Sequence, residues 1–420
     1  LMQTIVDYGK RSGNIKAIAS KSHIHRLLIC AALSDKKTAI KDVTFSNDIM
    51  TTVSCLNGYL ADIFVDSDTI IVQPYKKAAE NCVLNLNESG STYRFMVPVA
   101  CAIGANVSFT GAQRLAQRPL SPLYELLKKH GCSLSEEGVF PLYCSKKLEP
   151  GEFIIPGDVS SQFISGLLFA LPLLEGDSVI HITGKMESYP YIKMTLDAIN
   201  TFGIEVEQDE QSFYIKGNQR YISPKEVCAE GDWSNAAFFV ALGAMSEKGV
   251  TVYNVNLNSL QGDMKILDIV KRMGAKVEQA ENAVFVSGNE LTSTRIDASQ
   301  IPDLVPILAV LACAAKGETV IFNAARLRLK ESDRIESVYN MLINLGAHIK
   351  KTDDGFIING NGALKSGTVD SANDHRIVMA ASCATSITDG AVTINGSHAV
   401  HKSYPTFFED LSKLDLEKVL

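Results

Sequence analysis

Apolar and polar positions follow the same order in six successive segments of the chain. Each segment contains a short, mainly β-branched triplet, whose last residue lies at position 40, 109, 180, 252, 321 or 394, spaced 69, 71, 72, 69 and 73 residues apart. A fixed period of this length predicts one supersecondary unit used six times. The triplets are Thr38–Ile40, Val107–Phe109, Ser178–Ile180, Val250–Val252, Thr319–Ile321 and Val392–Ile394.

Two helices and several strands are predicted within each segment. A polar cluster precedes a long apolar run such as 161–174, which predicts a buried first helix. The triplet follows as a strand, and then a second, amphipathic helix such as 190–202 has apolar residues three and four apart. Short alternating strands such as 346–349 and 355–358 close the unit, giving the order β-α-β-α-β-β. Glycine marks the end of the second helix in Asn57-Gly58, His130-Gly131, Phe202-Gly203, Met273-Gly274 and Leu345-Gly346.

The chain length favours more than one domain. A chain of 420 residues exceeds an ordinary single core. Six copies could form one ring, two groups of three, or a solenoid, but solenoids normally have shorter repeats and polar caps. Two groups of three give domains of ordinary size, with the midpoint between 214–216 and 230–232. A small-molecule pocket is then expected between the domains.

Composition and charge limit the classes of protein and of partner that fit this chain. A hydrophobic content of 46% with 21% charged residues is typical of a globular protein and excludes a disordered one. A net charge of −7 argues against nucleic acid as a partner. Nine cysteines without a CxxC pair predict neither a metal site nor a disulfide framework, and fit a reducing compartment. We expect a cytoplasmic protein without a membrane partner, because no signal peptide or spanning run is visible.

Cations at predicted helix starts are the strongest chemical signal. A cation there opposes the helix dipole by about 0.3–1 kcal/mol unless an anion is bound. Each cation alone is equally well explained as part of a solvated turn, but together, in a net-negative protein, they predict a site for a small molecule with several negative charges. The seven cations are Lys21, Arg26, Arg118, Lys330, Arg334, Arg376 and Lys402.

Hydroxyl groups and carboxylates accompany these cations. Ser22 could cap the first helix, and Ser160 and Ser161 could cap another or bind phosphate. Asp303 precedes an apolar helix, and Glu331 lies among cations. Carboxylates beside cations in a closed site can have altered pKa values, so we predict acid–base catalysis with electrostatic clamping. A non-catalytic anion-binding module would need no such pair of carboxylates.

The ordered motifs resemble the 5-enolpyruvylshikimate-3-phosphate synthase family over essentially the full chain. That family has two domains, each of three β-α-β-α-β-β repeats (an inside-out α/β barrel), with helix N-termini facing an interdomain cleft. The resemblance implies a first domain at 15–228, mainly binding shikimate phosphate, and a second at 1–14 with 229–420 that carries acid–base and phosphoenolpyruvate-binding residues. The motifs are Ser20-Lys21-Ser22 with Arg26, Ser89-Gly90-Ser91 with Arg94, Gln117-Arg118-Pro119, Ser160-Ser161-Gln162, Ile301-Pro302-Asp303, Lys330-Glu331-Ser332-Asp333-Arg334, Asn373-Asp374-His375-Arg376 and His401-Lys402.

The resemblance also implies the reaction and its residues. Enolpyruvyl would pass from phosphoenolpyruvate to the 5-hydroxyl of shikimate 3-phosphate, releasing phosphate, in a monomer that needs no metal or cofactor. Lys21, Asp303 and Glu331 would move protons. Shikimate phosphate would contact Lys21, Ser22, Arg26, Ser160, Ser161, Gln162, Ser188, Tyr191, Asp303, Arg326 and Lys330. Phosphoenolpyruvate would contact Lys21, Gly90, Arg118, Gln162, Arg334, His375, Arg376 and Lys402.

One alternative and one departure bear on this interpretation. The related UDP-N-acetylglucosamine enolpyruvyl transferases usually carry Lys-Asn at the first motif and a reactive cysteine near position 118, whereas this chain has Lys21-Ser22 and no cysteine in 114–118. The family commonly has Asn-Ala-Gly-Thr where this chain has Glu88-Ser89-Gly90-Ser91. A carboxylate there repels an anion unless it points away or pairs with a cation, which bears on phosphoenolpyruvate affinity and on sensitivity to glyphosate.

Overall fold

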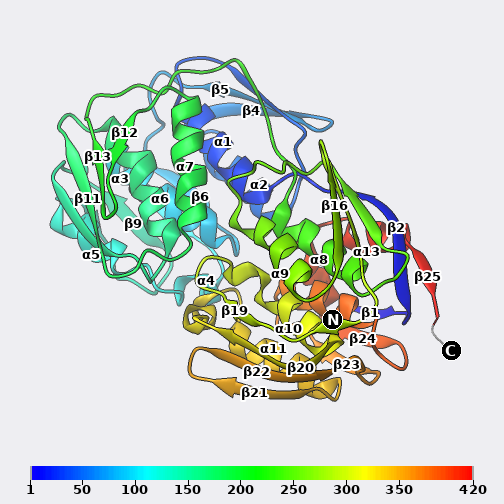
Figure 1. Ribbon diagram of the computed structural model, residues 1–420. Helices are drawn as coiled ribbons and strands as arrows, with labels where there is room; N and C mark the ends of the chain where they lie inside the picture. Colours follow the sequence, from blue (N-terminus) through cyan, green and yellow to red (C-terminus); the bar gives the residue numbers. More distant parts are fainter. Residues whose placement is uncertain (1, 419–420) are drawn as a thin grey trace. The chain divides into compact units, whose positions relative to one another are not determined.

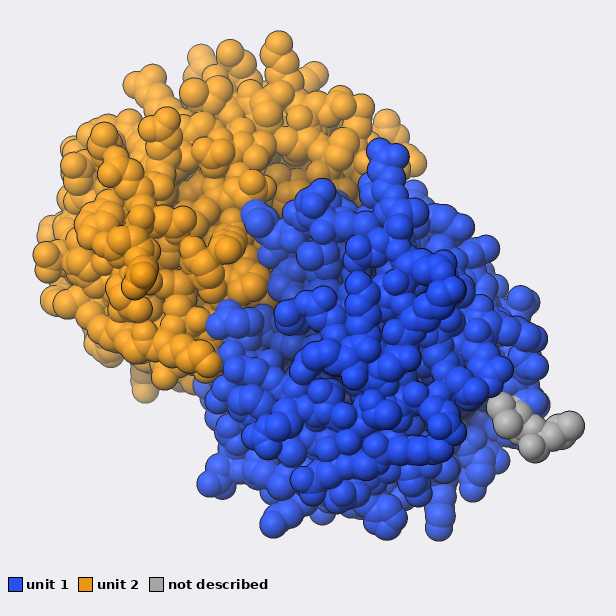
Figure 2. Space-filling view, viewed as in Figure 1, with its two compact units in different colours: residues 1–18, 230–420 blue, residues 19–229 orange. Residues whose placement is uncertain are grey.

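The structure is a computed structural model that describes residues 2–418. The chain divides into two compact units, which are coloured separately in Figure 2. Unit 1 comprises Leu1–Ile18 with Glu230–Leu420, and unit 2 comprises Ala19–Ala229. Each unit has its own hydrophobic core and contains three of the six repeats. The fold is the predicted mixed α/β fold.

Each of the six triplets lies in a strand, as predicted, and each of these strands pairs with a strand on both of its edges. In the third repeat, for example, β10 (Glu152–Pro156) runs parallel to the triplet strand, whose other edge pairs antiparallel with β13 (Ser212–Ile215). The triplet strands are β3 (Thr38–Lys41), β7 (Val107–Thr110), β11 (Ser178–Thr183), β15 (Val250–Tyr253), β20 (Ala315–Phe322) and β24 (Val392–Asn395).

Unit 2 has three four-stranded sheets, in the orders β14-β3-β5-β4, β6-β7-β9-β8 and β10-β11-β13-β12. Its remaining strands are β4 (Ala61–Asp66), β5 (Thr69–Pro74), β6 (Cys82–Asn85), β8 (Ser133–Leu134), β9 (Leu142–Ser145), β12 (Val206–Gln208) and β14 (Glu226–Cys228). Its helices are α1 (Lys21–Leu33), α2 (Asn47–Leu56), α3 (Gly90–Ile103), α4 (Gln113–Ala116), α5 (Leu123–Lys129), α6 (Ser161–Ala170), the 3₁₀ turn η1 (Leu171–Leu173) and α7 (Tyr189–Thr201).

Unit 1 has sheets in the orders β16-β17-β15-β2-β25, β18-β20-β22-β21 (with β19 also on β20) and β1-β24-β23. Its remaining strands are β1 (Gln3–Val6), β2 (Lys10–Lys16), β16 (Lys276–Ala280), β17 (Ala283–Ser287), β18 (Leu291–Thr292), β19 (Arg295–Asp297), β21 (His348–Thr352), β22 (Gly355–Asn361), β23 (Gly367–Asp370) and β25 (Asp415–Glu417). Its helices are α8 (Trp233–Ala244), η2 (Gly262–Lys265), α9 (Ile266–Arg272), η3 (Pro302–Leu304), α10 (Val305–Ala314), η4 (Ala325–Leu329), α11 (Arg334–Asn344), α12 (His375–Ala384), η5 (Ser397–Lys402) and α13 (Phe407–Ser412).

In the first and the fourth repeats, the strand that precedes the first helix pairs with the sheet of the other repeat. Strand β2 precedes α1 along the chain, yet it pairs in parallel with β15 of unit 1. Strand β14 precedes α8, yet it pairs in parallel with β3 of unit 2. The pairing of Lys16 with Tyr253 therefore keeps residues 15–18 in unit 1, whereas the sequence division at residue 15 assigns them to the other domain.

The sixth repeat is completed from the N-terminus. Strand β1 pairs antiparallel with β24, in the place that a hairpin strand takes in the other repeats. After α13 the chain adds β25, which pairs with β2. The first and last segments of the chain are thus held in the same unit by backbone hydrogen bonds.

Most residues in the first helix of each repeat are buried. In Figure 1 the strands β20, β22 and β21 lie on the outer side of α10. Every residue of α8 and of α12 is buried, although α12 begins with His375 and Arg376. Helices α3 and α6 approach closely, since a Cβ added to Gly166 would lie 2.4 Å from the carbonyl oxygen of Arg94. Within residues 2–418, no helix combines the length and apolarity that crossing a membrane requires.

Candidate active site

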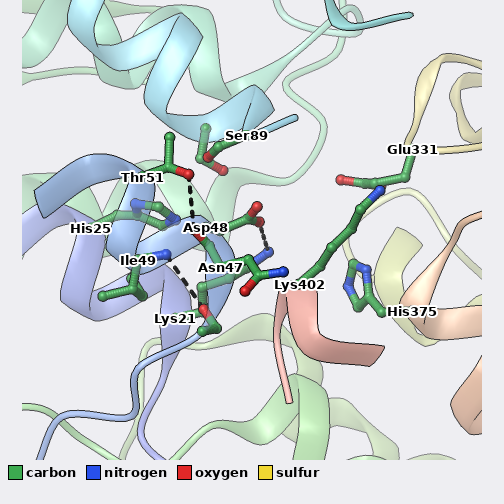
Figure 3. A network of polar contacts seen from close by, with 12 residues as sticks. Lys21, His25, Asn47, Asp48, Ile49, Thr51, Ser89, Glu331, His375 and Lys402 are labelled. Carbon is green, nitrogen blue, oxygen red and sulfur yellow. Dashed lines mark hydrogen bonds and ion pairs between the residues drawn. The ribbon is translucent and has the colours of Figure 1, made fainter. Parts of the chain in front are cut away.

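The start of α1 holds Lys21 against a carboxylate. Ser20, not Ser22, is the N-cap: its backbone is extended and its Oγ accepts a hydrogen bond from the His23 amide at 3.3 Å. Lys21 Nζ forms a 2.7 Å ion pair with Asp48 Oδ2 in the first turn of α2 (Figure 3). Asp48 was not predicted as a site residue, because an acid in a first turn is an ordinary partner of the helix dipole.

Arg26 is buried and organises other predicted site residues. Its Nε donates to Thr195 Oγ1 at 2.8 Å, its Nη1 to the Ser22 carbonyl at 2.7 Å and its Nη2 to the Tyr191 carbonyl at 2.9 Å. The guanidinium also lies over the Phe95 ring. Burial lowers the pKa of Arg26 to about 10, so the side chain stays charged at neutral pH. Arg26 therefore fixes α7 relative to α1.

The start of α3 combines a glycine with two arginines. A Cβ on Gly90 would lie 2.7 Å from Arg118 Nη1, so the absence of a side chain makes room for this guanidinium. Arg94 Nη1 donates to Gln162 Oε1 at 2.9 Å, and Gln162 Nε2 donates to Ser91 Oγ at 2.9 Å. This network joins the starts of α3 and α6 and fixes the amide of Gln162.

Hydroxyl groups begin α6 and α7. Ser160 is the N-cap of α6, with its Oγ accepting from the Gln162 amide at 3.3 Å, and Ser161 is the first helical residue. Ser188 precedes α7 in the left-handed conformation (φ 52°) and is buried. A non-glycine residue held in this region costs on the order of 1–3 kcal/mol, a strain that is concentrated at functional sites.

Glu88 is exposed, one residue before the N-cap Ser89 of α3. It lines a surface cavity of about 410 Å³ with Asn85, Asn87, Thr110, Gly111 and Ala112. An acid at this place is favourable to the α3 dipole. The carboxylate is thus exposed at the surface.

In unit 1 a buried arginine binds three carboxylates. Arg334, 1% exposed, is the first residue of α11. Its Nη1 lies 2.8 Å from Asp303 Oδ1, its Nη2 2.9 Å from Glu331 Oε2 and its Nε 2.8 Å from Asp374 Oδ2. Asp374 belongs to a predicted motif, but no role was predicted for it, because its partner lies 40 residues away. These contacts place the two predicted acid–base carboxylates, Asp303 and Glu331, on one guanidinium.

Asp303 has two further cationic neighbours. Lys330 Nζ lies 3.3 Å from Asp303 Oδ1, and Arg376 Nη2 lies 3.8 Å from Asp303 Oδ2. Burial alone would raise the pKa of Asp303, but Lys330, Arg334 and Arg376 together outweigh it and hold the pKa well below its usual range. Burial lowers the pKa of Lys330 in turn, while the Asp303 charge opposes this effect. Asp303 is therefore ionised at neutral pH.

The remaining predicted residues of unit 1 lie at neighbouring element ends. Arg326 Nη2 donates to the Ser299 carbonyl at 2.9 Å, and Lys402 Nζ donates to the Asn373 carbonyl at 2.9 Å. His375 is buried as the first residue of α12. In Figure 3 the Lys402 side chain points toward Glu331. The residues that the sequence predicted from positions 303 to 402 are thus gathered at the starts of α10, α11 and α12.

Arg26 is in the second turn of α1, and three more of the seven cations are not at helix starts, which corrects the sequence prediction. Arg118 lies between α4 and α5, Lys330 follows η4, and Lys402 ends η5. Prolines explain two of these cases, because a residue before proline avoids the helical region: Pro119 and Pro122 delay α5 to Leu123, and Pro405 delays α13 to Phe407. These connections still place the three cations next to helix starts. Within the described part of the chain, no cluster of histidine, cysteine and carboxylate side chains is arranged to hold a metal ion.

Comparison with known proteins adds independent evidence. The family model described as EPSP synthase (3-phosphoshikimate 1-carboxyvinyltransferase) matches residues 7–411. The chain is 43% identical over 409 residues to a protein of Clostridium acetobutylicum named 3-phosphoshikimate 1-carboxyvinyltransferase, covering 96% of this chain and 95% of that protein. It is 42% identical over 414 residues to the protein of the same name from Clostridium kluyveri, with the same coverage. The solved EPSP synthase of Acinetobacter baumannii has the same fold, with a TM-score of 0.83, 24% identity and full coverage of both chains.

Proposed function

The chain belongs to the EPSP synthase family, and we propose that the side chains gathered at its helix starts carry out the family's reaction. The enzyme transfers the carboxyvinyl group of phosphoenolpyruvate to the 5-hydroxyl of shikimate 3-phosphate and releases phosphate, a step of aromatic amino acid biosynthesis. The observation that carries the assignment of residues is the buried Arg334, which holds Asp303 and Glu331 beside Lys330 and Arg376. That the protein is cytoplasmic and monomeric stays a prediction.

Shikimate 3-phosphate is proposed to bind hydroxyl groups and cations. The amides and hydroxyls that open α6 form a typical phosphate site, because a helix start presents free N–H groups and a positive dipole end. Arg26 supports this site by holding the backbone of Ser22 and Tyr191. The proposed contacts are Lys21, Ser22, Arg26, Ser160, Ser161, Gln162, Ser188, Tyr191, Asp303, Arg326 and Lys330.

Phosphoenolpyruvate is proposed to bind the arginines and their neighbours. It carries a phosphate and a carboxylate, and the planar fork of arginine matches both groups with paired hydrogen bonds. Arg118 has the space that Gly90 leaves, and Gln162 is already oriented by Arg94. The proposed contacts are Lys21, Gly90, Arg118, Gln162, Arg334, His375, Arg376 and Lys402.

The reaction needs proton transfers in two stages. In the first, the 5-hydroxyl oxygen bonds to C2 of phosphoenolpyruvate and loses its proton, while C3 gains a proton, giving a tetrahedral intermediate. In the second, C3 loses a proton and the bond from C2 to the phosphate oxygen breaks, releasing phosphate. Asp303 suits the removal of the hydroxyl proton, because its cationic neighbours keep it ionised. Lys21 and Glu331 are proposed to exchange the proton at C3.

Replacing Gly90 with alanine is expected to raise the KM for phosphoenolpyruvate by about tenfold, since the new methyl group displaces the Arg118 guanidinium. Steady-state kinetics with each substrate varied in turn checks this expectation. The KM for shikimate 3-phosphate serves as the internal reference, because Arg118 is assigned to the other substrate. An unchanged KM for phosphoenolpyruvate would remove Arg118 from its binding.

Acceptor specificity tests the proposed function. The purified protein should release phosphate from phosphoenolpyruvate only when shikimate 3-phosphate is also present, as measured by a colorimetric phosphate assay. Phosphoenolpyruvate alone controls for simple hydrolysis. Release with UDP-N-acetylglucosamine in place of shikimate 3-phosphate would instead assign the chain to the other enolpyruvyl transferases.

A further inference from the structure

We propose that Asp263 is a positioning residue that acts through Ser234 on Arg376, and that its charge state sets how strongly Arg376 attracts phosphoenolpyruvate. Asp263 lies in η2, outside every motif that carries the family resemblance. The proposal rests on the proposed function, in which Arg376 contacts phosphoenolpyruvate.

A short chain of buried contacts joins Asp263 to Arg376. Ser234 Oγ donates to Asp263 Oδ2 at 2.5 Å. The carbonyl oxygen of the same Ser234 accepts from Arg376 Nη1 at 2.8 Å, and Asn235 Oδ1 accepts from Arg376 Nη1 at 3.2 Å. Asp263 is 1% exposed and Arg376 3% exposed. Asp263 therefore fixes the first turn of α8, which in turn fixes one side of the Arg376 guanidinium.

The turn that carries Asp263 is itself held against the start of α8. The neighbouring Gln261 accepts from the Trp233 amide through Oε1 at 2.9 Å and donates through Nε2 to the Gly231 carbonyl at 2.8 Å. Both contacts are buried. Asp263 thus has a rigid support, and a change in its charge acts on a fixed geometry.

The charged groups around Asp263 come from three other elements. Asp303 belongs to η3, Arg376 to α12, and Asp232 is the N-cap of α8, with Oδ1 accepting from the Asn235 amide at 2.9 Å. Asp303 is compensated by Lys330 and Arg334 as well as by Arg376. Asp232 is compensated by the amide that it caps. An ionised Asp263 is then a further negative charge that offsets part of the Arg376 charge.

Burial, followed by the Asp303 charge, raises the pKa of Asp263 to about 7, although the Ser234 hydroxyl and Arg376 oppose the rise and Asp232 adds to it. Below this pH the carboxyl is neutral, and Arg376 keeps its full attraction for an anion. Above it, the carboxylate weakens that attraction. By linkage, bound phosphoenolpyruvate favours the protonated form, so its KM should rise as pH increases through about 7.

The test compares Asp263→Asn with the wild-type enzyme over a pH series. Asparagine keeps the shape and can accept from Ser234, but it carries no charge. The phosphoenolpyruvate KM should rise less in the variant than in the wild type between about pH 6 and pH 8.5. The difference between the two rises should be up to about tenfold for each pH unit by which bound phosphoenolpyruvate shifts the pKa of Asp263. Titration of phosphoenolpyruvate itself is common to both proteins and cancels in the comparison.

Two more variants sharpen the test. Ser234→Ala removes the hydroxyl that lowers the pKa of Asp263, so the midpoint of the KM rise should move to higher pH. Asp268→Asn is the matched control: Asp268 is exposed, five residues along, and pairs with Lys265. It should reproduce the wild-type pH profile. Thermal unfolding of each variant shows whether it is folded. If Asp263→Asn does not fold, the pH profile of Ser234→Ala alone tests the inference.

Equal KM profiles for the wild type and Asp263→Asn, or a midpoint in Ser234→Ala that is unchanged or lower, would overturn the inference. A wild-type enzyme that releases no phosphate with both substrates present would instead refute the proposed function. The two failures are distinguishable, because the second is already visible in the wild type at a single pH.

Discussion

Replacing Asp303 with alanine is expected to lower kcat by about 100- to 10,000-fold, the contribution typical of a general base. Asp303 is the carboxylate that Lys330, Arg334 and Arg376 keep ionised, so its removal takes away the proposed acceptor of the hydroxyl proton. Binding of shikimate 3-phosphate should weaken far less, by about tenfold at most, because the loss is one hydrogen bond. The phosphate assay gives kcat, and titration calorimetry gives the Kd for shikimate 3-phosphate.

Asp303→Asn separates charge from shape in the same experiment. Asparagine fills the site but does not act as the base, so its kcat should fall as in the alanine variant, while the affinity for shikimate 3-phosphate stays closer to that of the wild type. A variant that retains full kcat would remove Asp303 from the mechanism. A variant that loses both turnover and binding in equal measure would make Asp303 a binding residue only.

Replacing Arg334 with methionine is expected to lower the free energy of unfolding by about 3–5 kcal/mol, the usual cost of breaking a buried ion pair from one side. The variant leaves Asp374, which is fully buried, without its cation, and Asp303 and Glu331 each lose a contact. Urea denaturation of both proteins measures the difference. Arg328→Met is the control, since Arg328 is 39% exposed and pairs with Asp333 at 3.3 Å; its effect should stay within about 1 kcal/mol.

The loss of stability in Arg334→Met should grow with pH. In the wild type, burial would raise the pKa of Asp374, but Arg334 in particular lowers it overall, so this group contributes stability above its unfolded pKa, which is lost as pH falls. Without Arg334, burial dominates and the folded state prefers the protonated acid. The variant then loses stability as pH rises above about 4. The difference in the free energy of unfolding between the variant and the wild type therefore increases toward neutral pH. Equal stability of the two proteins at pH 7 would contradict this account of the cluster.

The repeat pattern predicted the elements of the fold but not all of their pairing. The triplet strands and the glycine-marked helix ends were confirmed, because local apolar periodicity and turn chemistry determine them. The resemblance implied that residues 1–14 belong to the second domain, but the pairing of β2 with β15 and of β14 with β3 was not predicted, because the partner of a parallel strand is set by long-range topology. The replacement of the sixth hairpin by β1 was missed for the same reason.

The sequence predicted many candidate site residues but few of their partners. Lys21 and Arg334 stand out because cations at helix starts are unusual. Asp48 and Asp374 look like ordinary helix-start acids until the fold brings them to these cations, 27 and 40 residues away. Asp263 carries no local signal, because its burial and its contact with Ser234 arise only in the folded unit.

The most direct test of the central claim is the reaction itself in D₂O, with the product examined by mass spectrometry and the phosphate by ³¹P NMR. Addition at C3 of phosphoenolpyruvate followed by proton loss predicts that inorganic phosphate and a carboxyvinyl-shikimate phosphate appear in equal amounts. A fraction of that product should carry deuterium in its vinyl group, delivered by the acid–base residues at the helix starts. Phosphate without the new product, or a product free of deuterium, would contradict the account.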